Sequence, residues 1–238
     1  MADDMPLFDL SQLNFEEFVS FLFDHDMEKE EYWYHEPALH TFNTFNDKDV
    51  SSPSIIVKHM TRLFTEFSAV ASRYSLPQIN AGIWAMLGYG GFQLEKHLWL
   101  PAAPPDERLA CIRSMYFVYS DYVAKSTVEV MENCFDLWWD AVASGFWEQM
   151  DFELKINQGD TLSLNAEHRA LLDAMFETLS KILALPDLRT QGYALHGLGH
   201  LHHPGVRDLV QHFLDEHRQD LTAEGIDWVE QCRDGTVM

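Results

Sequence analysis

The chain has 238 residues, of which 47% are hydrophobic and 13% aromatic, so it can bury an ordinary core and is not wholly disordered. Sixteen Lys and Arg against 38 Asp and Glu give a formal net charge of −22. A surface this acidic repels nucleic acid and anionic membranes, which excludes both as expected partners and leaves a basic protein, or a metal ion, as the natural charged partner.

The negative charge is concentrated at the amino end, where residues 1–50 carry 13 acids and 2 bases. Acids crowd residues 24–31, and three large aromatic residues follow directly. Acids that steer a basic partner, beside aromatic anchors, are typical of a protein interface. The alternative is a solvated loop whose aromatic side chains fold back onto the core. We predict a partner-binding segment made of Asp24, Asp26, Glu28, Glu30, Glu31, Tyr32, Trp33 and Tyr34.

The amino-terminal half reads as a series of helices. Asn14, followed by two acids, predicts one helix start, and Ser75 with Gln78 three residues later predicts another. Between them, a long helix from about Pro53 to Ser72 carries apolar residues at helical spacing. These residues are Ile56, Met60, Leu63, Phe64, Phe67 and Val70. Residues 101–105 form a Pro-rich linker, and Pro105 restarts a helix.

The carboxyl-terminal half continues the helical pattern. Residues 126–129 form a capping box before an apolar stripe that includes Trp138 and Trp139. Because adjacent side chains on a helix point in different directions, one of these two tryptophans is expected near a surface or a second layer. Residues 151–163 read as a long loop, after which Asn165 caps the next helix. Pro186, Pro204 and residues 218–222 divide the tail into three short helices.

No segment alternates as a strand does, so the predicted class is all-α. We expect an irregular array of about eight or nine helices in a single domain, 1–238. A sub-division could fall at the Pro-rich linker 101–105 or at the loop 151–163.

One stretch carries a more specific pattern. Residues 193–201 read Tyr-Ala-Leu-His-Gly-Leu-Gly-His-Leu and precede His203-Pro204-Gly205-Val206 and the spaced apolar residues Leu209, Val210, Phe213 and Leu214. This stretch, at about 189–217, resembles one unit of the HEAT-like repeat (α-solenoid) family. The resemblance implies antiparallel helix pairs. Ala194, Gly197 and Gly199 are small enough to let paired helices approach closely.

The chain as a whole resembles the bacterial toxin-immunity proteins, which are small, acidic and cytosolic, and several of whose families are helical. That resemblance implies tight one-to-one binding of a cognate toxin domain. A nuclease toxin would be basic, because it must bind polyanions. The expected function is therefore an acidic helical protein-binding module of the immunity type, and no enzyme. Two alternatives remain: a helical enzyme or small-molecule or metal-binding protein with a His/Trp-lined pocket, and a HEAT-like scaffold.

Three histidines, His196, His200 and His203, stand at i, i+4 and i+7 and share one helical face. Imidazoles in this array could ligate Zn²⁺, Ni²⁺ or Cu²⁺. However, the chain contains no HExxH and no Glu-x-x-His, and the local sequence offers no carboxylate or thiolate companion. We therefore expect no metal, no other cofactor and no catalytic residue.

The three cysteines, Cys111, Cys134 and Cys232, are far apart and form no CxxC. This usage predicts free thiols in a reducing compartment. The first residues are acidic where a signal peptide is basic, and no apolar run approaches the roughly 20 residues of a membrane-spanning helix. A cytoplasmic location is expected.

Overall fold

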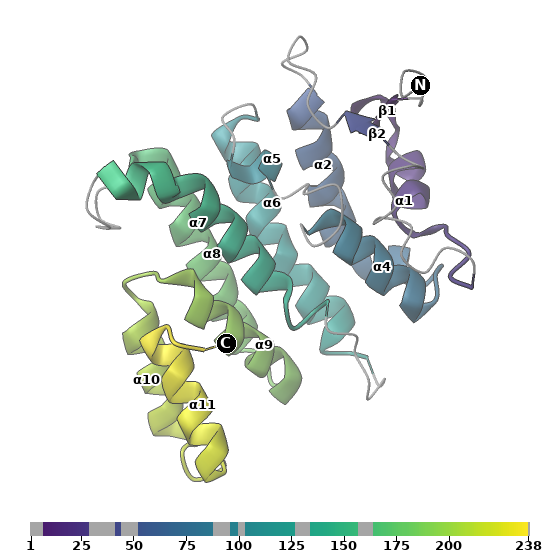
Figure 1. The fold of residues 1–238 in the computed structure, drawn as a ribbon. Coiled ribbons are helices and arrows are strands. Elements are labelled where there is room, and N and C mark those ends of the chain that lie inside the picture. The colour runs from purple at the N-terminus through teal and green to yellow at the C-terminus, as the bar shows by residue number, and fades with distance from the viewer. Residues whose placement is uncertain are drawn as a thin grey trace. The chain divides into compact units, whose positions relative to one another are not determined.

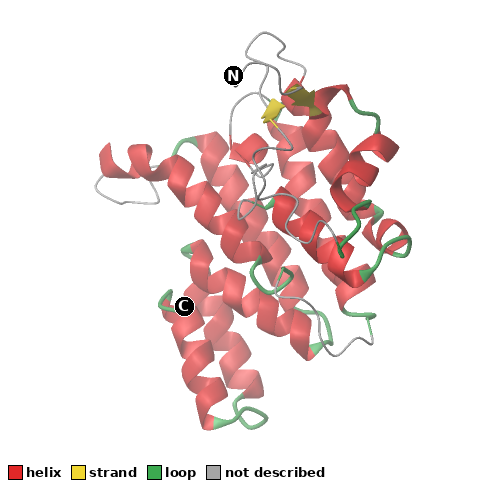
Figure 2. Ribbon diagram, turned by 45° about the vertical axis from the view of Figure 1, so that its right-hand side comes forward, coloured by secondary structure: helices red, strands yellow, loops and turns green. Residues whose placement is uncertain are grey.

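The computed structural model describes residues 7–28, 41–43, 52–87, 96–99, 103–126, 134–156 and 164–237. Eleven α-helices lie in these segments, which confirms the all-α class (Figure 2). The number exceeds the expected eight or nine, in part because the predicted helix at 53–72 is interrupted at Glu66, whose dihedral angles (φ −100°, ψ 14°) leave the helical region. Among the described residues, strand is limited to β1 (Leu7–Asp9) and β2 (Thr41–Asn43), which pair in parallel with Leu7 opposite Thr41.

The chain divides into two compact units. The first comprises Met1–Val118 and Val128–Cys134, and the second comprises Tyr119–Thr127 and Phe135–Met238. Each unit has its own helices and core, and each is described separately.

The first unit contains the two short strands, a 3-10 turn and six helices (Figure 1). Their bounds are η1 (Leu10–Gln12), α1 (Phe15–Phe23), α2 (Ser52–Thr65), α3 (Phe67–Ala71), α4 (Leu76–Met86), α5 (Lys96–Trp99) and α6 (Pro105–Phe117). Here α2 packs against α6, and α1 packs against α4. The predicted apolar stripe of residues 56–70 is buried throughout, as its helical spacing requires.

The helix starts of the first unit follow their local sequence. The Asn14 side chain accepts a hydrogen bond from the Glu17 backbone N–H, and the Glu17 carboxylate accepts one from the Asn14 N–H (2.8 Å). Ser75 and Gln78 form the predicted capping box of α4, and α6 begins at Pro105. These starts confirm the predictions, because each depends on residues no more than three positions apart.

The second unit contains five α-helices and all but the first residue of the π-helical turn η3 (Val118–Val123). These helices are α7 (Trp138–Ile156), α8 (Ala166–Leu183), α9 (Leu188–Leu201), α10 (Val206–His217) and α11 (Ala223–Asp234). Helix α7 continues six residues into the segment expected as a loop, because Asp151–Ile156 contains no glycine or proline. Residues 157–163 of that segment and 127–129 of the predicted capping box lie outside the described residues.

Helix α9 is central to the second unit, because it packs against α7, α8 and α11 (Figure 1). The Asn165 side chain caps α8 by accepting from the His168 N–H, as predicted, and Asp187 caps α9 in the same way. The three predicted tail helices correspond to α9, α10 and α11. None of the helices in the described segments combines the length and the apolar composition that crossing a bilayer demands.

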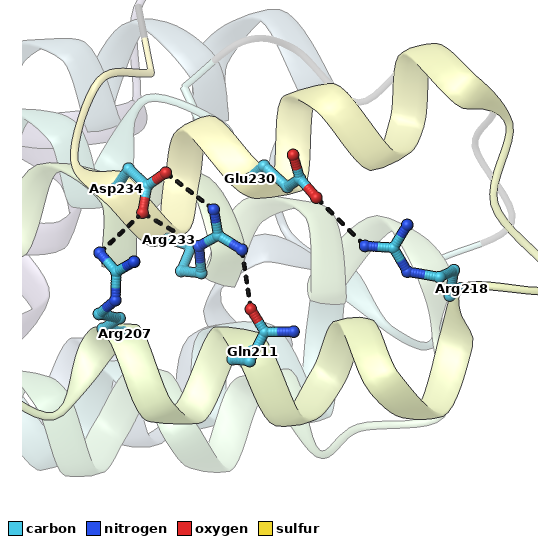
Figure 3. A network of polar contacts seen from close by, with 6 residues as sticks. All are labelled: Arg207, Gln211, Arg218, Glu230, Arg233 and Asp234. Atoms are coloured by element: carbon cyan, nitrogen blue, oxygen red, sulfur yellow. Dashed lines mark hydrogen bonds and ion pairs between the residues drawn. The ribbon is translucent and has the colours of Figure 1, made fainter.

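Polar contacts join the last two helices, α10 and α11 (Figure 3). The Asp234 carboxylate accepts from Arg207 Nη1 at 3.1 Å and from Arg233 Nη2 at 2.8 Å, and Arg233 Nη1 donates to Oε1 of the Gln211 side chain at 2.7 Å. Arg218, which follows α10, pairs at 3.1 Å with Glu230, one turn before Asp234 in α11. Apart from Arg233, whose side chain is 17% exposed, the charged groups of these pairs are at least one-third exposed, so each pair adds little stability.

Candidate functional site

Two histidines and two aspartates form a line of polar side chains in the second unit. His196 and His200 lie on α9, and their Nε2 atoms are 3.1 Å apart. His196 Nδ1 lies 3.3 Å from Asp136 Oδ1, and His200 Nδ1 lies 3.6 Å from Asp140 Oδ1. The sequence of groups is therefore carboxylate, imidazole, imidazole, carboxylate.

The arrangement follows from the way in which α7 and α9 pack. Successive turns of α9 contact successive turns at the start of α7, so the two helices run in the same direction. Asp140 lies in the first turn of α7, and Asp136 lies in the turn that precedes this helix, whereas His196 and His200 are four residues apart and occupy one side of α9. Gly197 permits the approach, because a Cβ there would stand 2.4 Å from the Cβ of Trp139.

The two imidazoles differ in their electrostatic surroundings. The hydrogen bond with Asp136 raises the pKa of His196, although burial opposes this shift. Burial lowers the pKa of His200, and the Asp140 carboxylate only partly offsets the effect. The His196 side chain is 8% exposed and the His200 side chain 23%, so solvent reaches the pair mainly at His200.

His203 does not join this pair. The Gly205 N–H donates to His203 Nδ1, so the ring proton is on Nε2, which lies 3.1 Å from Asp173 Oδ1 on α8. The same ring stacks on Phe176 with 4.1 Å between centroids. Helix α9 ends at Leu201, so the expectation that His203 shares its face is wrong: the structure brings His196 and His200 together and places His203 against α8. Within the described segments, no group of three or more His, Cys, Asp or Glu side chains is arranged to hold a metal ion.

Sequence reasoning missed Asp136 and Asp140, which stand 60 residues before their histidine neighbours. The available signal was the matching four-residue spacing of the two aspartates and the two histidines. That signal acquires meaning only when α7 and α9 are known to pack side by side.

The predicted partner-binding segment is described only at its beginning. Asp24, Asp26 and Glu28 follow α1 with exposed side chains. Glu30, Glu31, Tyr32, Trp33 and Tyr34 lie outside the described residues.

The base of this acidic segment is attached to the first unit by specific contacts. Gln78 Nε2 on α4 donates to the His25 carbonyl oxygen at 3.0 Å, and His25 Nε2 lies 2.8 Å from the Phe21 carbonyl oxygen. Gly82 allows α4 to approach the end of α1, because a Cβ there would stand 2.4 Å from the Phe23 ring. These contacts hold the backbone at the start of the acidic segment against α1 and α4.

The two adjacent tryptophans lie in the interior: Trp138 and Trp139 are both completely buried, so neither is at a surface, and the expected second layer is the alternative that remains. Both rings are enclosed because Trp138 makes an edge contact with Tyr119 while Trp139 packs on Gly197.

A cavity of about 360 Å³ lies among α8, α9 and α10. Leu183, Leu209 and Phe213 form its apolar wall, and His212 and Glu216 form part of its polar rim. Its volume falls at the lower end of the range for small-molecule sites.

Comparison of the chain with protein-family models, with curated proteins and with solved structures finds no match.

Proposed function

We propose that this chain is an acidic helical protein-binding module, an immunity-type inhibitor that neutralises a cognate basic toxin domain by tight binding. The observation that carries the proposal is the net charge of −22, together with the exposed carboxylates of Asp24, Asp26 and Glu28 directly after α1. Long-range attraction between such a surface and a basic domain accelerates their encounter and favours productive orientations.

The attachment of the acidic segment supports this role. Its first residues are fixed by the Gln78–His25 hydrogen bond and by the close packing of α1 on α4 at Gly82. A binding segment with a fixed base loses less conformational freedom on association than a free one, and more of the contact energy appears as affinity. Within the segment, Tyr32, Trp33 and Tyr34 are the proposed anchors, because large aromatic side chains dominate interface energetics.

The proposed scaffold is HEAT-like. In the second unit, α9 runs opposite to α8, since Leu179 lies near Gly197 and Phe176 lies near His203. Helices α7 and α9 share a direction, as do α9 and α11, where Gly199 approaches Cys232 and Gly235 approaches His202. Alternating helices of this kind are the arrangement that the HEAT-like resemblance implies, and they support it.

Small-molecule binding is the second candidate function, and the cavity among α8, α9 and α10 favours it. Ligand-observed NMR with a library of small organic molecules tests this candidate. Binding that Leu209→Trp abolishes, by filling the cavity, supports it. No binding to the parent chain contradicts it.

The test of the leading proposal uses the protein encoded by the reading frame beside the gene for this chain, which the proposal requires to carry a basic toxin domain. Association and dissociation rates are measured at low and high salt for the parent chain and for the triple variant Asp24→Lys, Asp26→Lys, Glu28→Lys. We expect association at low salt to slow by about tenfold or more, with a smaller difference at high salt, because screening shortens the reach of the charges to about 8 Å at physiological strength.

The matched control is the triple variant Asp215→Lys, Asp220→Lys, Asp227→Lys, which makes the same change in net charge at exposed positions of the second unit. Its association rate should change less than that of the first variant. Trp33→Ala should instead raise the dissociation rate. If the parent chain neither binds the domain nor protects cells that express it, the immunity function is wrong. Equal slowing by both triple variants would mean that total charge, and not the acidic segment, steers association.

A further inference from the structure

The contact between His196 and His200 is unusual in the atoms that meet. The rings are inclined at 69°, and nitrogen faces nitrogen with the two Nε2 atoms 3.1 Å apart. Two imidazole nitrogens at this distance require a positive charge or a proton between them, because two lone pairs that face each other repel.

The neighbouring carboxylates determine which nitrogens carry protons. Asp136 lies 3.3 Å from Nδ1 of His196, and Asp140 lies 3.6 Å from Nδ1 of His200. At His196 the contact with Asp136 is a hydrogen bond, which places the proton on Nδ1; at His200 the separation of 3.6 Å is longer than a hydrogen bond, and the charge of Asp140 favours a proton on Nδ1 only through electrostatic attraction. Both Nε2 atoms then carry lone pairs, and they lie 3.1 Å apart.

This pattern is the one that protein ligands of transition metals adopt. A metal-bound histidine donates its other ring N–H to a carboxylate or a carbonyl group, which fixes the tautomer and orients the ring. Two nitrogens 3.1 Å apart, each about 2.05 Å from one ion, subtend about 98° at that ion. The angle lies between the tetrahedral value of about 109° and the square-planar value of about 90°.

We propose that His196 and His200 form a two-nitrogen site for a divalent transition-metal ion, with Asp136 and Asp140 as the carboxylates that orient the two rings. Imidazole donors suit Cu²⁺, Ni²⁺ and Zn²⁺, and for a site of this kind Cu²⁺ binds most tightly. Two protein ligands leave coordination positions for water or for a side chain of a bound partner. The exposed part of His200 gives the ion access.

The sequence alone led to the opposite expectation, because the histidines have no carboxylate companion within their own helix. The structure supplies two such companions, Asp140 from α7 and Asp136 from the turn that precedes α7. The proposal is independent of the immunity function and does not require a partner protein.

The test uses the full chain without a histidine tag, stripped of metal and held at about pH 8, where imidazole is neutral. Titration with Cu²⁺, Ni²⁺ and Zn²⁺ by calorimetry should give one ion per chain, with Cu²⁺ bound most tightly. In NMR spectra of the unaltered chain, Cu²⁺ should broaden the ring signals of His196 and His200 before those of the other histidines. This measurement requires no substitution.

His200→Gln should weaken binding at least tenfold, and the exposed His212→Gln should leave it unchanged. Asp136→Asn keeps both metal ligands and should weaken binding about 10–100-fold, because the orienting carboxylate is lost. Far-UV circular dichroism of each variant confirms that it is folded. Absence of uptake by the parent chain, or Cu²⁺ that first broadens other histidines, would overturn the proposal and leave a shared proton as the occupant of the space between the rings.

Discussion

Two glycines of α9 provide an internal comparison of how closely the helices of the second unit pack. An ideal Cβ at Gly197 would stand 2.4 Å from Trp139 Cβ and 3.1 Å from a methyl carbon of Leu179. An ideal Cβ at Gly192, in the same helix, meets nothing within 4 Å. Alanine at both positions adds the same atom to the same helix, so any difference between the variants reports the local packing.

The expected effects have opposite signs. Gly192→Ala should stabilise the protein by about 0.5–1 kcal/mol, because alanine loses less backbone entropy in a helix. Gly197→Ala brings the same entropic stabilisation. However, its Cβ must push α9 away from α7 by roughly 1 Å before the carbon–carbon contact reaches an ordinary distance. Overpacking of this kind costs about 1–3 kcal/mol, so we expect a net loss of about 0.5–2 kcal/mol.

Both variants are compared with the parent chain by urea unfolding, with thermal unfolding as a second measurement. A difference of 1 kcal/mol corresponds to about 2–4 °C in the melting temperature of a chain of this size. The ring signals of His196 should shift in Gly197→Ala and not in Gly192→Ala, because the movement of α9 separates His196 from Asp136. Equal stabilisation by the two substitutions would refute the close approach of α7 and α9, and with it the geometry of the histidine–aspartate line.

Two further predictions concern buried titratable groups. Burial lowers the pKa of His97 to about 4. As the pH falls, the unfolded chain therefore takes up a proton at this residue before the folded chain does. The free energy of unfolding should fall by about 3 kcal/mol between about pH 6.5 and about pH 4. Urea unfolding at a series of pH values should show this loss of stability. His97→Gln should reduce the loss, and the exposed His212→Gln should not. Equal pH dependence in the parent chain and both variants would contradict the prediction. The three cysteines are buried, and burial raises the pKa of Cys111 and Cys232 to about 12. A thiol reagent at about pH 8 should therefore react with the native chain far more slowly than with the chain in denaturant, and rapid labelling of the native chain would show that these side chains are accessible.

Local sequence determined the helical class and most helix starts of this protein. Asn14, Ser75, Pro105 and Asn165 each begin a helix where the sequence predicts one. A cap needs only a side chain and a backbone N–H two or three residues away, so this information is contained in a few consecutive residues. The buried stripe of α2 and α3 follows in the same way from helical spacing. The break between the two helices at Glu66 does not, because the apolar spacing continues across it.

The candidate site was accessible to sequence reasoning only in part. The acidic segment was found from charge alone, and the structure describes its first three acids as exposed side chains. His196 and His200 were identified by their spacing, but so was His203, which pairs with Asp173 on another helix. Spacing shows which residues share a helical face and does not show which helix lies opposite that face.

Only the tertiary structure decided which groups meet across the second unit. The pairing of Asp136 with His196 joins residues 60 positions apart and depends on the shared direction and register of α7 and α9. The close contact between Gly197 and Trp139 likewise joins residues that are far apart in the chain. The same packing encloses both tryptophans. Local patterns specify each helix, whereas the chemistry of the site arises from the packing of helices far apart in the chain.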